Sequence, residues 1–319
     1  RFIEIVPEID IPGHSQAAIA AYPELLACDP ENPHQVWVGQ GVSADVINVA
    51  KPEAVKFAQD VIDELTQLFP FGYLHLGGDE CPTTKWQKNE ACRAQLEALG
   101  STNFRDLQLN FYRQLQTYIA TLPAERQRRL VFWNEVIHGN TAMLKDPVIM
   151  AWIGADRDAR AAAERGMDVI LTPQIPYYIN RKQSKDATEP HTQGHGTETV
   201  EAVYGYVPAK DVPAPLLKYY LGVQGNFWTE WVEDASTVEY CHVWPPLPRP
   251  DGHRKRTATS PISRHVSCHT ANCTNTKAGT TENICGSNRF RFSCNAWRRR
   301  SSWISAAMRH TMLTDTAAA

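Results

Sequence analysis

The sequence predicts an α/β protein built on a parallel sheet or a (β/α)8 barrel, and two observations support this prediction. Short apolar runs alternate with helix-favouring segments over the first 240 residues. Acidic or aromatic residues follow where several of these runs end. Alternating strand and helix units favour parallel strands, and the carboxyl ends of parallel strands share one edge, where α/β enzymes carry their chemistry.

The chain opens on the β-rich run Phe2–His14, which Pro7 and Pro12 interrupt. Because proline fixes its own backbone, the end of this run is a rigid turn that holds Asp10 and His14 before a helix. A single histidine is usually a structural residue. This one follows a strand end, so we expect it to meet the acidic residues that follow the next strand.

Two glycines and two acids end the next unit. The apolar residues of Pro52–Leu68 recur at helical spacing, and the apolar run Tyr73–Leu76 follows a Phe-Pro-Phe-Gly turn. Asp79 and Glu80 come directly after the two glycines. Neighbouring carboxylates on an extended backbone point in different directions and can take different tasks. The alternative is that one of them caps the next helix, since acidic N-caps are common.

Further apolar runs predict the remaining strands: Leu130–Trp133, Val148–Trp152, Val169–Thr172 and Leu221–Trp228. Asp156–Gly166 is rich in alanine and arginine and predicts a helix, whereas the polar segment Asn180–Thr199 predicts an insertion. A tryptophan near a strand tip is a core residue by default. Beside acids and glycines it indicates a sugar-binding cage, because the C–H-rich face of a pyranose packs well on an aromatic ring.

The segment PEIDIPGH followed by HLGGDE resembles the family 20 glycoside hydrolases, the β-N-acetylhexosaminidases. Each motif is moderately specific, and the two in this order at this separation are highly specific. Further matching residues are Trp133 in LVFWNEV, Trp152 in VIMAWIG, Tyr178 in TPQIPYYINRKQ, and Trp228 with Glu230 in GVQGNFWTEW.

The resemblance implies a mechanism in which the substrate's own 2-acetamido group replaces a protein nucleophile. Glu80 would be the general acid for the leaving group and then the base for water. Asp79 would orient the acetamido nitrogen and balance its developing positive charge. His14 would contact Glu80, and Asp10 is expected among the residues that bind substrate.

The same resemblance assigns the other binding residues. Tyr178 would donate its hydroxyl to the acetamido oxygen, and Glu230 would accept hydrogen bonds from sugar hydroxyls. Asn180 stands where many relatives carry an aspartate, and its amide can still bind a sugar hydroxyl. Three indoles would wall the pocket for the acetamido methyl: Trp133, Trp152 and Trp228.

The resemblance covers residues 1–240 and implies a partial (β/α)8 (TIM) barrel that lacks its first strands. An open arc of about six strands would remain. The absent strands would bring a substrate-binding arginine and an aspartate partner for His14. We therefore expect the chain as it stands to be inactive.

Residues 241–319 are a basic, irregular tail rich in Arg, Ser, Thr and Cys and poor in aliphatic residues. Its cysteines and histidines raise a zinc site as an alternative, but their spacings do not follow the paired patterns of zinc modules. A nucleic-acid-binding tail is a second alternative, given Arg298–Arg300. We favour a shifted reading frame or a misassembled gene end after Tyr240 and expect a segment of low order, with neither metal nor nucleic acid bound.

The composition is that of a protein with one sizeable core. The chain has 319 residues, a net charge of −3, a pI near 6.4 and 43% hydrophobic residues. No apolar run is long enough to cross a membrane, and no phosphate-binding loop or dinucleotide motif occurs, so we expect no cofactor. By resemblance the protein would be exported. Cys81 and Cys92 would then pair or remain free thiols.

Three functions remain open. The first is hydrolysis of terminal non-reducing N-acetylhexosamine from β-linked oligosaccharides or glycoconjugates. The second is a different sugar-processing barrel that uses Glu8 or Asp10 as its nucleophile. The third is an inactive carbohydrate-binding relative, which the pair Asp79 and Glu80 disfavours, because binding alone needs no carboxylic acid beside a tryptophan cage. The sequence leaves the natural glycan, the gluco or galacto preference and the oligomeric state open.

Overall fold

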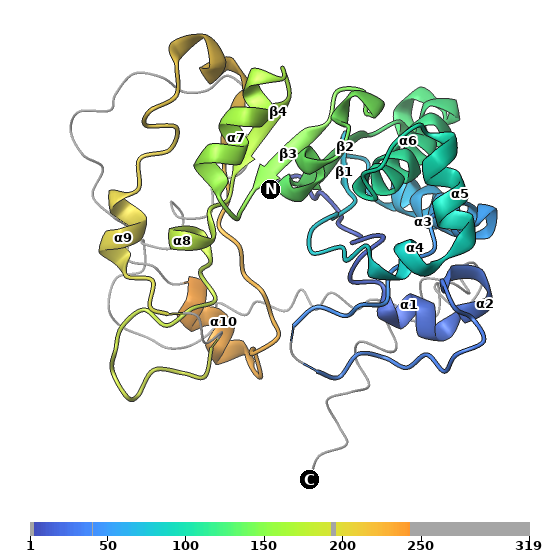
Figure 1. Ribbon diagram of the computed structural model, residues 1–319. Coiled ribbons are helices and arrows are strands. Elements are labelled where there is room, and N and C mark those ends of the chain that lie inside the picture. The colour runs from blue at the N-terminus through green and yellow to red at the C-terminus, as the bar shows by residue number, and fades with distance from the viewer. Residues whose placement is uncertain (1–2, 40, 193–195, 243–319) are drawn as a thin grey trace.

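The computed structural model describes residues 3–39, 41–192 and 196–242. Within these residues five parallel strands form one sheet in chain order, with α1–α6 beside β1 and β2 and α7–α10 toward the other end (Figure 1). The strands are β1 (Tyr73–His75), β2 (Arg129–Trp133), β3 (Val148–Ala151), β4 (Asp168–Leu171) and β5 (Tyr220–Val223). This arrangement confirms the predicted α/β class and the parallel sheet.

The helices occupy the segments between the strands. The α-helices are α1 (Gln16–Ala21), α2 (Pro23–Leu26), α3 (Pro52–Leu68), α4 (Thr84–Lys88), α5 (Glu90–Ala98), α6 (Arg105–Thr121), α7 (Ala155–Glu164), α8 (Gln174–Tyr177), α9 (Val200–Gly205) and α10 (Ala235–His242). The 3-10 helices are η1 (Ala124–Arg126), η2 (Asn134–His138), η3 (Thr141–Met143) and η4 (Ala214–Tyr219).

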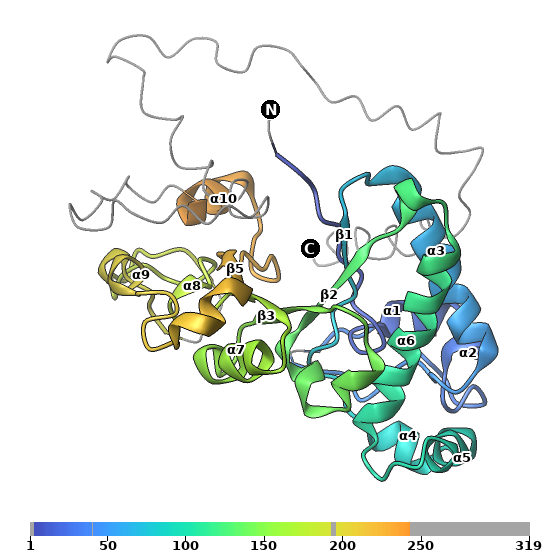
Figure 2. The ribbon, with the colours of Figure 1, turned by 90° about the horizontal axis from the view of Figure 1, so that it is seen from above.

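Helix α3 has the bounds predicted from its apolar spacing. Pro52 occupies its first turn, where a missing N–H costs nothing, and Ala54, Ala58, Ile62 and Leu65 are buried on one face. This face packs in the same core as α6, and Figure 2 shows both helices along one side of β1 and β2.

The two faces of the sheet carry different side chains, because successive residues of a strand point to opposite faces. Leu130 and Phe132 of β2 belong to the large cluster under the helices, which we call the outer face. Val131 and Trp133 belong to a smaller cluster on the opposite, inner face. The alternation continues in β3, where Ile149 packs outward.

The N-terminal run Phe2–His14, predicted as a strand, pairs with β1 only through a single bridge between Glu8 and His75. The His75 amide donates to the Pro7 carbonyl at 3.0 Å, and the Ile9 amide donates to the His75 carbonyl at 3.0 Å. The prolines explain the difference, because a residue without an N–H interrupts the ladder. The sheet therefore has five strands and a bridge where about six strands were expected.

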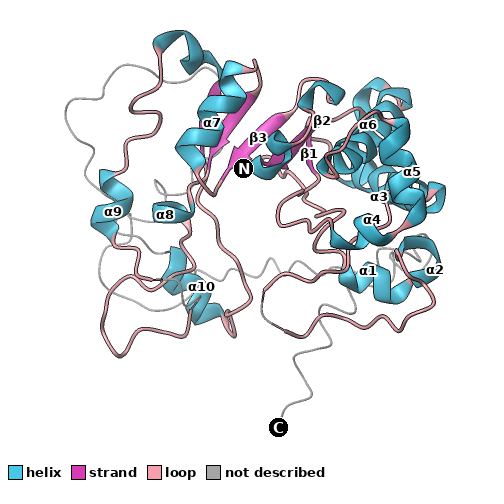
Figure 3. Ribbon diagram, in the orientation of Figure 1, coloured by secondary structure: helices cyan, strands magenta, loops and turns pink. Residues whose placement is uncertain are grey.

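The second half of the sheet is less regular than predicted. The run Leu221–Trp228 forms a strand only to Val223, after which Asn226 makes an isolated bridge with Tyr178. Figure 3 shows that loops make up most of the chain between β4 and β5. The polar insertion predicted at Asn180–Thr199 lies in this part.

Among the described residues, Cys28, Cys81, Cys92 and Cys241 form no disulfide, so the alternative of a Cys81–Cys92 pair is not formed. The thiol of Cys92 lies 3.3 Å from the Asn48 side-chain oxygen. No helix among the described residues is long and apolar enough to cross a membrane. Apart from Cys241 and His242, the predicted tail and its zinc and nucleic-acid alternatives lie outside the described residues.

Candidate active site

The two glycines after β1 are required by both conformation and space. Gly77 and Gly78 have φ of +66° and +101°, a backbone region that residues other than glycine rarely adopt. A Cβ on Gly77 would lie 1.8 Å from the Asp10 Oδ1, and one on Gly78 would lie 2.7 Å from the Tyr112 hydroxyl. The turn thus brings the backbone against Asp10 and lets two acids follow at the sheet edge.

The structure brings together the predicted histidine and both predicted acids. The His14 Nε2 lies 3.3 Å from the Glu80 Oε2 and 3.7 Å from the Asp79 Oδ2. Hydrogen bonds to Asp79 and Glu80 hold the pKa of His14 far above its usual value, so the imidazole is positively charged. Both His14 (φ +45°) and Glu80 (φ +42°) have strained left-handed backbones, which are common at functional sites.

Asp10 lies close to Asp79 and binds the backbone of the turn that precedes it. The Gly78 amide donates to the Asp10 Oδ1 at 2.9 Å, and side-chain atoms of Asp10, His14 and Asp79 all lie within 4.8 Å of one another. Burial and the charge of Asp79 raise the pKa of Asp10 well above its usual range. Asp10 therefore takes up a proton more readily than an ordinary carboxyl, a property that the sequence did not reveal.

Two polar side chains of α6 support this edge and were missed in the sequence. The Tyr112 hydroxyl donates to the Ile11 carbonyl at 2.6 Å, and the Gln108 amide donates to the Gly78 carbonyl at 2.9 Å. Both side chains are buried. Their signal was a pair of polar groups four residues apart on an otherwise apolar helix face.

Four aromatic side chains predicted as a cage gather on the inner face. The ring centroids of Trp152 and Tyr178 lie 5.9 Å apart and nearly parallel, at 13°. Trp228 lies 6.0 Å from Trp133 and 6.3 Å from Tyr178. The bridge between Tyr178 and Asn226 explains this meeting, because it joins the segment after β4 to the segment that carries Trp228.

Two further carboxylates accept the indole N–H groups of this cage. Glu8 accepts from the Trp133 Nε1 at 2.8 Å, and Glu135 accepts from the Trp152 Nε1 at 2.9 Å and 3.1 Å to its two oxygens. Partial burial raises the pKa of each acid to about 7. Glu135 was missed in the sequence, although it lies in the same LVFWNEV segment as Trp133.

The two remaining predicted residues, Asn180 and Glu230, differ in burial. Asn180 is buried beside the ion pair of Arg181 and Glu198, whose Nη1 and Oε1 are 2.8 Å apart. Glu230 is exposed in the turn that follows Trp228.

Two clusters of acids and histidine have the spacing of a metal site among the described residues. One is Asp10, His14 and Asp79, where a charged imidazole already offsets the carboxylates. The other is Asp29, His34 and Asp45. There the Lys85 Nζ lies 2.6 Å and 3.1 Å from the two aspartates and supplies the positive charge that an ion would bring.

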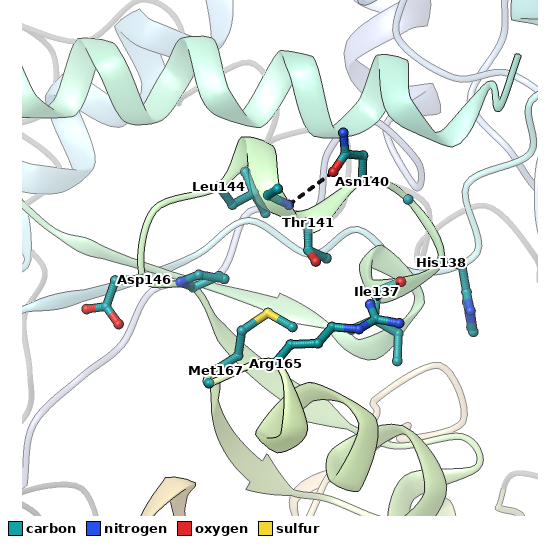
Figure 4. Close-up of a pocket in the computed structure, with 12 residues that line it drawn as sticks. Ile137, His138, Asn140, Thr141, Leu144, Asp146, Arg165 and Met167 are labelled. Atoms are coloured by element: carbon teal, nitrogen blue, oxygen red, sulfur yellow. Dashed lines mark hydrogen bonds between the residues drawn. The ribbon is translucent and has the colours of Figure 1, made fainter. Parts of the chain in front are cut away.

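A cavity of about 800 Å³ opens at the opposite edge of the sheet, near the starts of β3 and β4 (Figure 4). Its lining includes Asn140, Asp146 and Met167, and Arg165 donates to the Ile137 carbonyl at 2.8 Å. None of the predicted site residues lines it. The candidate site is therefore the carboxyl edge with the charged histidine and the aromatic cage.

An acid pair at the carboxyl edge of a parallel sheet, beside a cage of aromatic rings, is the arrangement of a carbohydrate-processing enzyme. The catalytic-domain model of glycosyl hydrolase family 20 matches residues 1–248, and the chain belongs to this family.

Named relatives agree with this assignment. The chain is 37% identical over 244 residues to the β-hexosaminidase of Porphyromonas gingivalis, a match that covers 75% of this chain and 30% of that protein. It is 34% identical over 249 residues to the β-hexosaminidase of Vibrio furnissii, covering 77% of this chain and 39% of that protein. The chain thus spans well under half the length of these curated relatives.

A solved structure shows the same fold. The family 20 exo-β-N-acetylglucosaminidase from Vibrio harveyi, in complex with N-acetylglucosamine, matches with a TM-score of 0.67 and 32% identity. The match covers 82% of this chain and 41% of that one.

Proposed function

We propose that this chain is the catalytic part of an exported enzyme that removes terminal non-reducing N-acetylhexosamine residues from β-linked glycans. The observation that carries the proposal is the contact of His14 with both Asp79 and Glu80, next to the aromatic cage. The family assignment and the bound sugar in the Vibrio harveyi relative support it.

The proposed reaction uses the substrate's acetamido group. Its carbonyl oxygen attacks the anomeric carbon while Glu80 protonates the departing glycosidic oxygen, which leaves an oxazolinium ion. Water then attacks the anomeric carbon, loses its proton to Glu80 and reopens the ring. Asp79 would balance the positive charge that develops on the acetamido nitrogen.

The other residues would bind and orient the sugar. Tyr178 donates its hydroxyl to the acetamido oxygen, and three indoles enclose the methyl group. Asn180 and Glu230 bind hydroxyls, and the exposed position of Glu230 suits a contact that forms only with sugar present. The charged His14 orients Glu80. The indoles are Trp133, Trp152 and Trp228.

We also propose that the sheet is an arc of a (β/α)8 barrel, which further strands would close. Inner-face residues Tyr73, His75 and Met150 line an open cavity of about 270 Å³. Val6, which also lines it, is 41% exposed. Both observations are consistent with a barrel interior whose side chains further strands would bury. We call the chain with such strands added the completed enzyme.

A protein nucleophile has less support. Glu8 is hydrogen-bonded to the Trp133 indole, and Asp10 accepts a hydrogen bond from the Gly78 amide. Each candidate for that role is thus engaged in holding another residue of the site.

The test has two measurements. The completed enzyme should hydrolyse p-nitrophenyl N-acetylglucosaminide and leave the plain glucoside intact. The chain itself should bind N-acetylglucosamine-thiazoline, which copies the cyclised intermediate, more tightly than free N-acetylglucosamine, because the cage lies within the described residues. Cleavage of both glycosides would favour a protein nucleophile, and sugar binding without any hydrolysis would favour a binding protein.

A further inference from the structure

Trp133, Asn134 and Glu135 follow one another at the end of β2, and the last two both hold the tip of β3. The Asn134 Oδ1 accepts the Trp152 backbone N–H at 2.9 Å, and its Nδ2 donates to the Ile153 carbonyl at 3.0 Å. The same Nδ2 lies 2.7 Å from Asp158 on α7. Asn134 is completely buried. The backbone of Trp152 is therefore fixed by the residue that follows Trp133.

The side chain of Trp152 is fixed separately. Its indole N–H donates to both Glu135 oxygens, at 2.9 Å and 3.1 Å, and only 9% of the residue is exposed. An indole N–H at such a buried position needs an acceptor, since an unpaired buried donor is costly. The acceptor selects the ring orientation that stacks on Tyr178.

Rotation about the side-chain bonds of Trp152 would move this stacked face out of the cage. Asn134 cannot prevent the rotation, because it touches only backbone atoms of Trp152 and Ile153 in this region. Glu135 can, because it binds the far end of the ring.

We propose that Glu135 is a positioning residue that sets the width of the acetamido pocket through the indole of Trp152. The proposal rests on the proposed function. Glu135 acts as a hydrogen-bond acceptor and does not touch the sugar. An amide oxygen can accept the same N–H, so glutamine should replace it, whereas leucine should not. The pair Glu8 and Trp133 repeats the arrangement on the neighbouring strand and supplies a matched control.

The first experiment observes the indole N–H groups of the full chain labelled with 15N-tryptophan. Trp152→Phe and Trp133→Phe assign the two resonances. We expect Glu135→Leu to move the Trp152 resonance upfield and leave that of Trp133 in place, with Glu135→Gln close to the parent. Glu8→Leu should move the Trp133 resonance alone. A Trp152 resonance that Glu135→Leu leaves in place would overturn the role of Glu135, whether or not any ligand binds.

The second experiment measures the dissociation constant of N-acetylglucosamine-thiazoline for the same variants by calorimetry. Glu135→Leu should weaken binding about tenfold, the effect of one buried hydrogen bond, and Glu135→Gln about twofold or less. In a Trp152→Phe background, which lacks the indole donor, Glu135→Leu should weaken thiazoline binding little further. In the parent background, Glu135→Leu should also reduce the ratio between the affinity for the thiazoline and the affinity for its N-propionyl homologue.

These outcomes separate the two ideas. Equal losses in the Gln and Leu variants, undiminished in the Trp152→Phe background, would show that Glu135 acts on the ligand directly and would overturn the positioning role. Absence of thiazoline binding to the parent chain would overturn the proposed function, while the indole resonances would still decide whether Glu135 orients Trp152.

Discussion

The outer and inner faces of the sheet differ in what their side chains contact. Outward residues such as Phe132 and Ile149 are fully buried among apolar side chains of the helices. Inward residues such as Trp133 combine an apolar ring with a polar partner, in this case Glu8. The free energy of apolar packing depends on the buried area and volume, whereas the hydrogen bond of an indole depends on the direction of its N–H group. The outer face should therefore determine stability, and the inner face should determine activity.

The largest effect on activity should come from Glu80→Gln. Loss of the general acid should lower kcat of the completed enzyme on a natural disaccharide by about 10²–10⁴-fold, with substrate binding retained. Steady-state kinetics checks this, and Ile149→Val on the outer face is the matched control that should leave kcat unchanged. Near-normal turnover in Glu80→Gln would remove Glu80 from the acid role.

The largest effect on stability should come from the outer face. Phe132→Ala should lower the free energy of unfolding by about 3–5 kcal/mol, because it opens a cavity in the packed core. Trp133→Phe on the inner face keeps most of the ring and should cost far less stability while weakening thiazoline binding. Urea unfolding with a binding assay tests both. Equal stability losses in the two variants would break the contrast between the faces.

Asp79→Asn should weaken thiazoline binding and slow the reaction by about 10²-fold, because it removes the charge that balances the oxazolinium. Asp10→Asn is the informative companion, since it removes the neighbouring carboxyl and leaves Asp79 itself unchanged. An unchanged affinity for the thiazoline in Asp79→Asn would contradict its assigned role.

The smallest effect concerns pH. The pKa values of Glu8 and Glu135 are raised from 4.5 to about 7, so the folded state keeps protons that the unfolded state has released. Stability should therefore fall as pH rises from 4.5 toward 7. The double variant Glu8→Gln, Glu135→Gln should reduce this fall by about 1–2 kcal/mol between pH 4.5 and 6.5, after screening of the partly exposed groups. An unchanged slope in urea unfolding would contradict the raised pKa values.

The sequence predicted the carboxyl-edge cluster because strand order alone determines it. His14, Asp79 and Glu80 each follow a segment that runs parallel to its neighbour, so they meet without knowledge of side-chain packing. The cage was predictable for the same reason, except that Tyr178 and Trp228 meet through a bridge at Asn226.

The remaining features depend on side-chain direction, which a pattern of residue types does not give. Asp10 is expected to bind sugar, and its side chain also accepts a hydrogen bond from the Gly78 amide, a contact that the sequence did not reveal. Glu135 contacts an indole 17 positions away, and no local spacing rule joins them. The N-terminal strand was predicted to be longer than it is. Two prolines remove backbone hydrogen bonds to β1 only where their missing N–H groups would have faced that strand, and the sequence does not show which residues face it.

The hydroxyl of Tyr112 has a consequence for how the molecule opens. It joins α6 to the Ile11 carbonyl, while Gln108 joins the same helix to Gly78. The two segments that deliver His14 and Asp79 are thus tied to the middle of a long buried helix. Local fluctuation of either segment would break contacts with α6, so the acid–histidine cluster and α6 should unfold as one cooperative unit. Amide protons of Ile11 and Gly78 should then exchange with solvent as slowly as those in the centre of α6.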